Sequence, residues 1–163
     1  VNLQGMSEAD AKRGPFGGPD RKSDIEALVA WITSESKGVT MAVSLDHPKM
    51  RENFELGKAI FFFRGGPHDF ACATCHGEDG KRILLQDLPN RSAKSGAQKG
   101  YTTWPAYRVS QGELRTVQWR LNDCFRQQRF PELEFGSPAS IALTTFLAYN
   151  ANGAAFAAPA IKR

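Results

Sequence analysis

A CxxCH motif at residues 72–76 constrains this chain more than any other feature of its sequence. Two thiols at this spacing, Cys72 and Cys75, can add to the two vinyl groups of one haem, and the adjacent His76 imidazole can then ligate the iron. A CxxC redox pair would follow a strand in a βαβ unit, and no such pattern is present. A zinc site needs four ligands, and the chain has only three Cys and three His. The motif therefore predicts one covalently bound haem c.

The motif and the composition also bear on location and partners. Because thioether attachment is normally made outside the cytosol, we expect a periplasmic protein of a bacterium. An odd number of Cys excludes a fully paired set of internal disulfides. The 163 residues carry a formal charge of +4, which is too weak to indicate a nucleic-acid partner. No apolar run approaches the roughly 20 residues that span a membrane, so we expect no membrane span.

Apolar periodicity predicts helices, and no alternating stretch is long enough to indicate a sheet. We therefore expect an all-α fold with long loops, in which residues 1–19 are a tether and residues 81–103 a surface loop. Gly57 lies inside a predicted helix, where glycine costs about 1 kcal/mol against alanine, so it predicts a close packing contact. Ser137 is a suitable N-cap for the last helix. The predicted helices cover residues 23–38, 49–62, 113–129 and 137–150.

The order of these elements is typical of a class I cytochrome c. An aromatic-containing helix at residues 49–62 precedes the CxxCH motif, and a helix closes the chain. In that arrangement the first and last helices cross near the edge of the haem. The sequence therefore predicts a class I cytochrome c-like domain.

The sixth iron ligand is harder to assign than His76, because no Met and no further His follow it. Cys124 is then the strongest candidate, with water, a Lys or an open site as alternatives. A lone Cys on an apolar helix face is usually an inert core residue, but an unpaired thiol in an exported protein usually has a use. Arg120 lies one turn before Cys124, so we expect its charge to lower the pKa of the thiol. We also expect an anion beside Arg120, either a haem propionate or a substrate.

Four further segments carry a resemblance to a known family. They are residues 104–108 (WPAYR), 121–124 (LNDC), 129–133 (RFPEL) and 140–144 (SIALT). Together with the CxxCH motif they resemble SoxA, the larger subunit of the SoxAX cytochrome of bacterial thiosulfate oxidation. The resemblance covers roughly residues 45–163. It implies a cytochrome c domain there, and it implies that residues 1–44 are the tail of a truncated cytochrome-like domain.

The resemblance also implies a role for each candidate residue. Cys72 and Cys75 would carry the haem thioethers, and His76 would be the proximal iron ligand. Cys124 would be the distal ligand and the sulfur acceptor, which the family carries as a persulfide. Arg120 would bind the thiosulfate anion.

The implied activity is that of an L-cysteine S-thiosulfotransferase. Such an enzyme joins thiosulfate oxidatively to a cysteine of the carrier protein SoxYZ and passes electrons to SoxX, a small cytochrome c, in a heterodimer. The alternatives are a simple periplasmic electron-transfer cytochrome c and a thiosulfate dehydrogenase that forms tetrathionate. The Arg120–Cys124 pair favours the thiosulfotransferase over a simple electron-transfer cytochrome. The single CxxCH motif disfavours the dehydrogenase, because those enzymes are typically di-haem.

Overall fold

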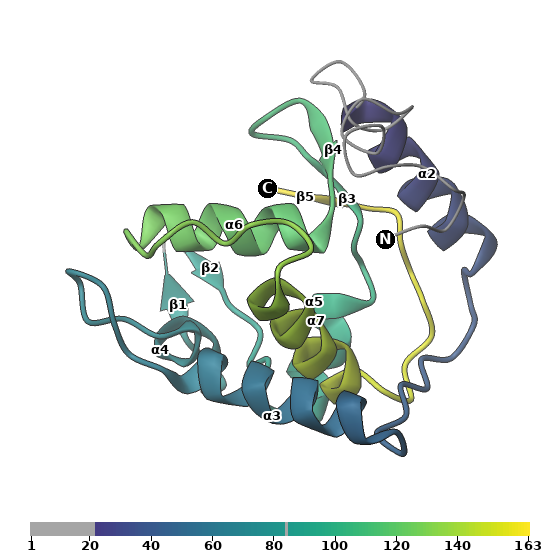
Figure 1. Cartoon of the computed structure of the whole chain (residues 1–163). Coiled ribbons are helices and arrows are strands. Elements are labelled where there is room, and N and C mark those ends of the chain that lie inside the picture. The colour runs from purple at the N-terminus through teal and green to yellow at the C-terminus, as the bar shows by residue number, and fades with distance from the viewer. Residues whose placement is uncertain (1–21, 84) are drawn as a thin grey trace, which may run out of the picture.

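The computed structural model describes residues 22–83 and 85–163, and helices dominate this part of the chain (Figure 1). The tether expected at residues 1–19 lies outside the described residues. Two small sheets accompany the helices. The helices are α2 (Lys22–Glu35), α3 (Pro48–Phe62), α4 (Cys72–His76), α5 (Lys94–Tyr101), α6 (Val117–Gln127) and α7 (Pro138–Asn150). The strands are β1 (Arg82–Ile83), β2 (Gln86–Asp87), β3 (Ala106–Arg108), β4 (Glu113–Arg115) and β5 (Ala160–Lys162).

Helices α3 and α7 pack against each other, with α3 along the lower edge of the view in Figure 1, in agreement with the expected crossing of the first and last helices. A Cβ atom at Gly57 would collide with the backbone carbonyl of Ala142 and would lie 2.9 Å from Cβ of Phe146. The predicted close contact at Gly57 is therefore confirmed. Beside the crossing, Phe61 and Leu143 are almost completely buried and form the main core.

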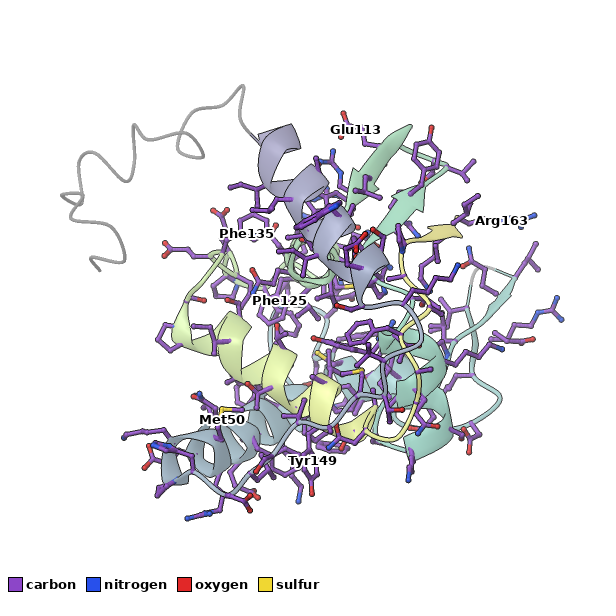
Figure 2. The ribbon with its side chains drawn as sticks, turned by 90° about the vertical axis from the view of Figure 1, so that its right-hand side faces the viewer. Met50, Glu113, Phe125, Phe135, Tyr149 and Arg163 are labelled. Carbon is purple, nitrogen blue, oxygen red and sulfur yellow. The ribbon has the colours of Figure 1, made fainter. Side chains whose placement is uncertain are left out.

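Aromatic side chains extend this contact along the two helices. The ring centroid of Phe54 on α3 lies 5.4 Å from that of Phe146 and 4.9 Å from that of Tyr149, both on α7. Figure 2 shows Tyr149 next to α3, near the end that carries Met50. The α3–α7 pair is thus a packed base for the elements that surround it.

The start of α7 is confirmed, whereas the start of α6 differs from the prediction. Ser137 Oγ accepts a hydrogen bond from the backbone N–H of Ser140 at 3.3 Å, as expected of an N-cap. Thr116 Oγ1 caps α6 in the same way, with the N–H of Trp119 at 3.2 Å. The helix therefore begins at Val117 rather than at residue 113. The preceding residues form β4, which pairs with β3 across a turn.

A three-stranded sheet shows that the expected all-α fold was wrong in part. Its order is β4–β3–β5, with β3 antiparallel to β4 and parallel to β5. Each strand has three residues, which is too short for the alternation of apolar and polar residues that reveals a strand in sequence. The β3–β5 register aligns Arg108 with Lys162, so the end of the described chain lies beside residues 106–108 (Figure 1).

The predicted surface loop at residues 81–103 was also wrong, because it contains the β1–β2 hairpin and α5. Glycine is a poor helix former, and α5 contains two of them, so its sequence gives no helical signal. Packing stabilises this helix instead. Ala97 is 1% exposed and packs with Met41, Ala148 and Ala151, which places α5 against α7.

Helix α2 lies at the margin of the fold and contacts it mainly through β4 (Figure 1). Arg115 Nη1 lies 3.2 Å from Glu26 Oε1, and both side chains are less than one-fifth exposed. The Arg115 guanidinium also lies 4.8 Å from the ring centroid of Trp119. The outer face of α2 includes Trp31, which is 62% exposed. The assignment of residues 1–44 to the tail of a second cytochrome-like domain stays a prediction.

Candidate functional site

A cavity of about 690 Å³ lies among α4, α5, α6 and α7. All five residues that the sequence singled out line it: Cys72, Cys75, His76, Arg120 and Cys124. Phe125 of α6, which is partly buried, and Arg163, which Figure 2 shows at the edge of the molecule, also line the cavity. Much of the remaining wall is apolar and comes from Phe61, Leu121, Phe130, Leu143 and Leu147.

The CxxCH motif forms the single short helix α4. Thr74 Oγ1 accepts a hydrogen bond from the backbone N–H of Ala71 at 2.9 Å, which fixes the first turn. Cys72 and Cys75 are three residues apart on this helix, so their side chains lie on one side of it. Burial, and next the nearby Cys124 thiol, raise the pKa of Cys72 to about 12. The two segments that carry the three cysteines therefore meet in this cavity.

One hydrogen bond fixes the orientation of the His76 ring. Its Nδ1 lies 3.0 Å from the carbonyl oxygen of Pro89, and since a carbonyl can only accept, Nδ1 carries the proton. Burial, and next the charge of Arg91, lower the pKa of His76 to about 4. The imidazole is therefore neutral at physiological pH, with a lone pair on Nε2. This is the form in which histidine ligates a metal, and a hydrogen bond from Nδ1–H to a carbonyl commonly supports such a ligand.

Cys124 lies on α6 in a partly buried position. The charges of Arg120 and Arg91 act to lower the pKa of its thiol, as expected, but burial outweighs them and raises that pKa. The expected effect of Arg120 is present, but the net direction is the reverse, because the sequence did not reveal how far the thiol is desolvated. A thiolate at Cys124 requires a bound metal, which deprotonates a coordinating thiol outright.

The anion beside Arg120 is a side chain of the same helix. Arg120 Nη1 lies 2.6 Å from Oδ2 of Asp123, which is 5% exposed. The Asp123 carboxylate also accepts hydrogen bonds from Arg126 Nη2 at 2.7 Å and Gln127 Nε2 at 2.8 Å. Sequence analysis proposed a propionate or a substrate here and missed Asp123. The i, i+3 spacing of Arg120 and Asp123 on a helix was the signal that could have found it.

Five further cations line the same cavity and were given no role in the site from the sequence: Arg91, Lys99, Arg108, Lys162 and Arg163. Arg91 lies in the segment that was predicted to be a loop. Arg108 and Lys162 come together only through the β3–β5 register. Arg108 belongs to the WPAYR segment that carries the family resemblance, but no local spacing in the sequence links it to Arg91 or Lys162.

The residues present in the cavity fit a haem c. Cys72 and Cys75 have the spacing for two thioethers, His76 is a neutral imidazole, and the Cys124 sulfur is a second metal-ligating group. The apolar wall suits the macrocycle, and the cations suit its carboxylates. One orphaned atom supports this fit, because Arg108 Nε is buried without a hydrogen-bond partner in the described structure.

The chain is similar to known proteins in sequence and in fold. A family model described as SoxA/TsdA, cytochrome c domain, matches residues 56–156. The chain is 50% identical over 161 residues to the L-cysteine S-thiosulfotransferase subunit SoxA of Hydrogenophilus thermoluteolus, covering 99% of this chain and 59% of the relative. It is 37% identical over 142 residues to a SoxA subunit of Hydrogenobacter thermophilus, covering 86% of this chain and 53% of that relative. The chain thus spans little more than half the length of these relatives.

The fold also has a match among solved structures. A chain of the SoxXA crystal structure from P. pantotrophus superposes with a TM-score of 0.74 and 24% identity, covering 95% of this chain and 56% of that one. This likeness shows a shared fold. In the described part of the chain, no helix has the length and apolar character needed to cross a membrane.

Proposed function

Since this chain belongs to the SoxA/TsdA cytochrome c domain family, we propose that it provides the haem–thiolate centre of an L-cysteine S-thiosulfotransferase. The reaction couples thiosulfate to a cysteine of a SoxYZ-like carrier protein. The carrier thiol loses its proton, a sulfur–sulfur bond forms to the outer sulfur of thiosulfate, and two electrons are released. The observation that carries this proposal is the meeting of Cys124, Arg120 and the CxxCH motif in one cavity.

Each residue of the site has a distinct task. Cys72 and Cys75 would hold one haem c through thioether bonds, and His76 and Cys124 would ligate its iron. Bound haem c supplies the one-electron redox chemistry that a coupling with loss of two electrons requires. The hydrogen bond to Pro89 keeps the lone pair of His76 available, so no protonation change is needed at this ligand.

Cys124 is also the sulfur acceptor, in the form of a persulfide. Arg120 binds thiosulfate beside it, and the Asp123 carboxylate holds the guanidinium of Arg120 in place. A fixed guanidinium offers two donors in one plane, which suits an oxyanion better than a mobile lysine does. The apolar wall that includes Phe125 limits the access of water to the sulfur.

We assign the released electrons to a SoxX-like small cytochrome c that forms a heterodimer with this subunit. The fold shared with a chain of the P. pantotrophus SoxXA structure supports this assignment. The periplasm is the proposed location, because haem c attachment occurs outside the cytosol.

Replacement of the candidate ligand tests this proposal. In the haem-loaded protein we expect Cys124→Ser to change the ferric absorption and electron paramagnetic resonance spectra and to abolish thiosulfate coupling to the carrier. Gln118→Ala, on the same helix but outside the haem cavity, serves as the control and should change neither. Spectra that are unchanged in Cys124→Ser would exclude thiolate ligation. A product that is tetrathionate rather than a carrier adduct would favour a thiosulfate dehydrogenase.

A further inference from the structure

Two cations on the neighbouring strands β3 and β5 line the cavity that also contains the CxxCH motif. Arg108 ends β3 and Lys162 ends β5, and these residues are direct partners in the parallel register. Side chains of paired residues on adjacent strands leave the sheet on the same face. Both line the cavity that also contains Cys124, and both are only partly exposed.

The described residues offer these two cations no negative partner. Arg120 pairs with Asp123 and Arg115 pairs with Glu26 and Glu113, whereas no described carboxylate lies within salt-bridge distance of Arg108 or Lys162. Arg108 Nε is buried and has no hydrogen-bond partner in this part of the chain. A buried donor without a partner is unfavourable unless a ligand or water satisfies it.

The surroundings hold these charges in place instead of neutralising them. Lys162 Nζ lies 5.5 Å from the ring centroid of Trp104, whose own Nε1 is buried without a hydrogen-bond partner in the described structure. Burial, and next the charges of Arg91, Arg108 and Lys99, lower the pKa of Lys162 to about 8. Positive charges that repel one another in a partly desolvated wall are stabilised when an anion enters between them.

We propose that Arg108 and Lys162 together form an oxyanion-binding site in the cavity, separate from the Arg120–Asp123 pair. The ligand is a small oxygen anion, either the sulfonate end of thiosulfate or a carboxylate of the haem. Arg108 offers a planar fork of donors to such a group, and Lys162 adds a point charge beside it. The thiosulfate alternative rests on the proposed function, whereas the carboxylate alternative needs only a bound haem.

The variants Arg108→Gln and Lys162→Gln test this site in the haem-loaded protein, with Lys58→Gln on the exposed face of α3 as the matched control. Binding of thiosulfate and of sulfate is measured by isothermal titration calorimetry without carrier or electron acceptor. If the sulfonate is the ligand, both variants should bind both dianions roughly tenfold more weakly, as expected for loss of a charged hydrogen bond. Since no turnover is involved, this result is independent of whether the chain has thiosulfotransferase activity.

A second measurement identifies the haem carboxylate as the ligand. In that case dianion binding stays unchanged, and the haem midpoint potential falls in both variants because a positive charge near the haem has been removed. Arg108→Lys keeps the charge but loses the planar fork, so it should fold normally and give an intermediate effect. If all these variants match Lys58→Gln in both dianion binding and midpoint potential, the site does not exist.

Discussion

Replacing Gly57 with alanine tests whether the α3–α7 crossing holds this fold together. Two effects of opposite sign act at this position. Alanine is the better helix former by about 1 kcal/mol, so helix propensity alone predicts that Gly57→Ala stabilises the protein. Packing predicts the reverse, because the added Cβ would collide with the Ala142 carbonyl and lie 2.9 Å from Cβ of Phe146.

The packing effect should be the larger one. Inserting a methyl group into a well-packed core costs about 1–3 kcal/mol, and here the cost should lie near the upper end. A flexible side chain could rotate away from the new methyl group, whereas the Ala142 carbonyl belongs to the backbone of α7. Relief therefore requires the two helices to separate. When the gain of about 1 kcal/mol from helix propensity is subtracted from this packing cost, a net loss of about 1–2 kcal/mol in the free energy of unfolding is expected.

Thermal unfolding of the haem-loaded protein, followed by far-UV circular dichroism, measures this loss. For a chain of this size, about 1–2 kcal/mol corresponds to a fall in Tm of about 2–8 °C. Lys58→Ala, one residue along α3 and exposed, is the control and should change the free energy of unfolding by less than about 0.5 kcal/mol. If Gly57→Ala is as stable as the unchanged protein or more so, the reasoning from close packing is wrong.

Two ion pairs give further predictions. Glu26→Gln should lower the free energy of unfolding by about 1 kcal/mol, since it removes the partner of a largely buried Arg115. A double-mutant cycle with Arg115→Gln measures their coupling, and a coupling energy of zero would show that this pair does not hold α2 to β4. Asp123→Asn should free the Arg120 guanidinium and raise KM for thiosulfate several-fold while kcat changes less. A fall in kcat with KM unchanged would instead show that Asp123 does not position a substrate-binding group.

Features that depend on a few neighbouring residues could be predicted from the sequence. The CxxCH motif holds both thiols and the imidazole of the predicted haem site within five residues. Ser137 caps its helix by accepting from an N–H three residues further along. Gly57 was informative because a glycine inside a helix needs a reason. Even at Arg120 the need for an anion was predicted, although the anion itself is Asp123 on the same helix.

Features that depend on contacts between distant segments could not be predicted. Helix α5 contains two glycines and is stabilised by packing of Ala97 against α7, about fifty residues further along the chain. The β3–β5 pair joins segments of three residues each, which are too short for any periodic pattern. The net direction of the pKa shift at Cys124 could not be predicted for a similar reason. Burial of the thiol is a property of the folded chain and not of the helix that carries the residue.

These long-range contacts decide the charge of the site. Asp123 neutralises Arg120 within α6, so that pair adds little net charge to the cavity. The remaining positive charge comes from Arg91, Lys99, Arg108, Lys162 and Arg163. The packing of α5 and the β3–β5 register bring these residues to the cavity. If the two haem carboxylates neutralise two of these cations, others remain to attract a further anion. Arg120 therefore gives direction to a bound oxyanion, whereas the cations of β3, of β5 and of the segment from Arg91 to α5 determine that an anion enters at all.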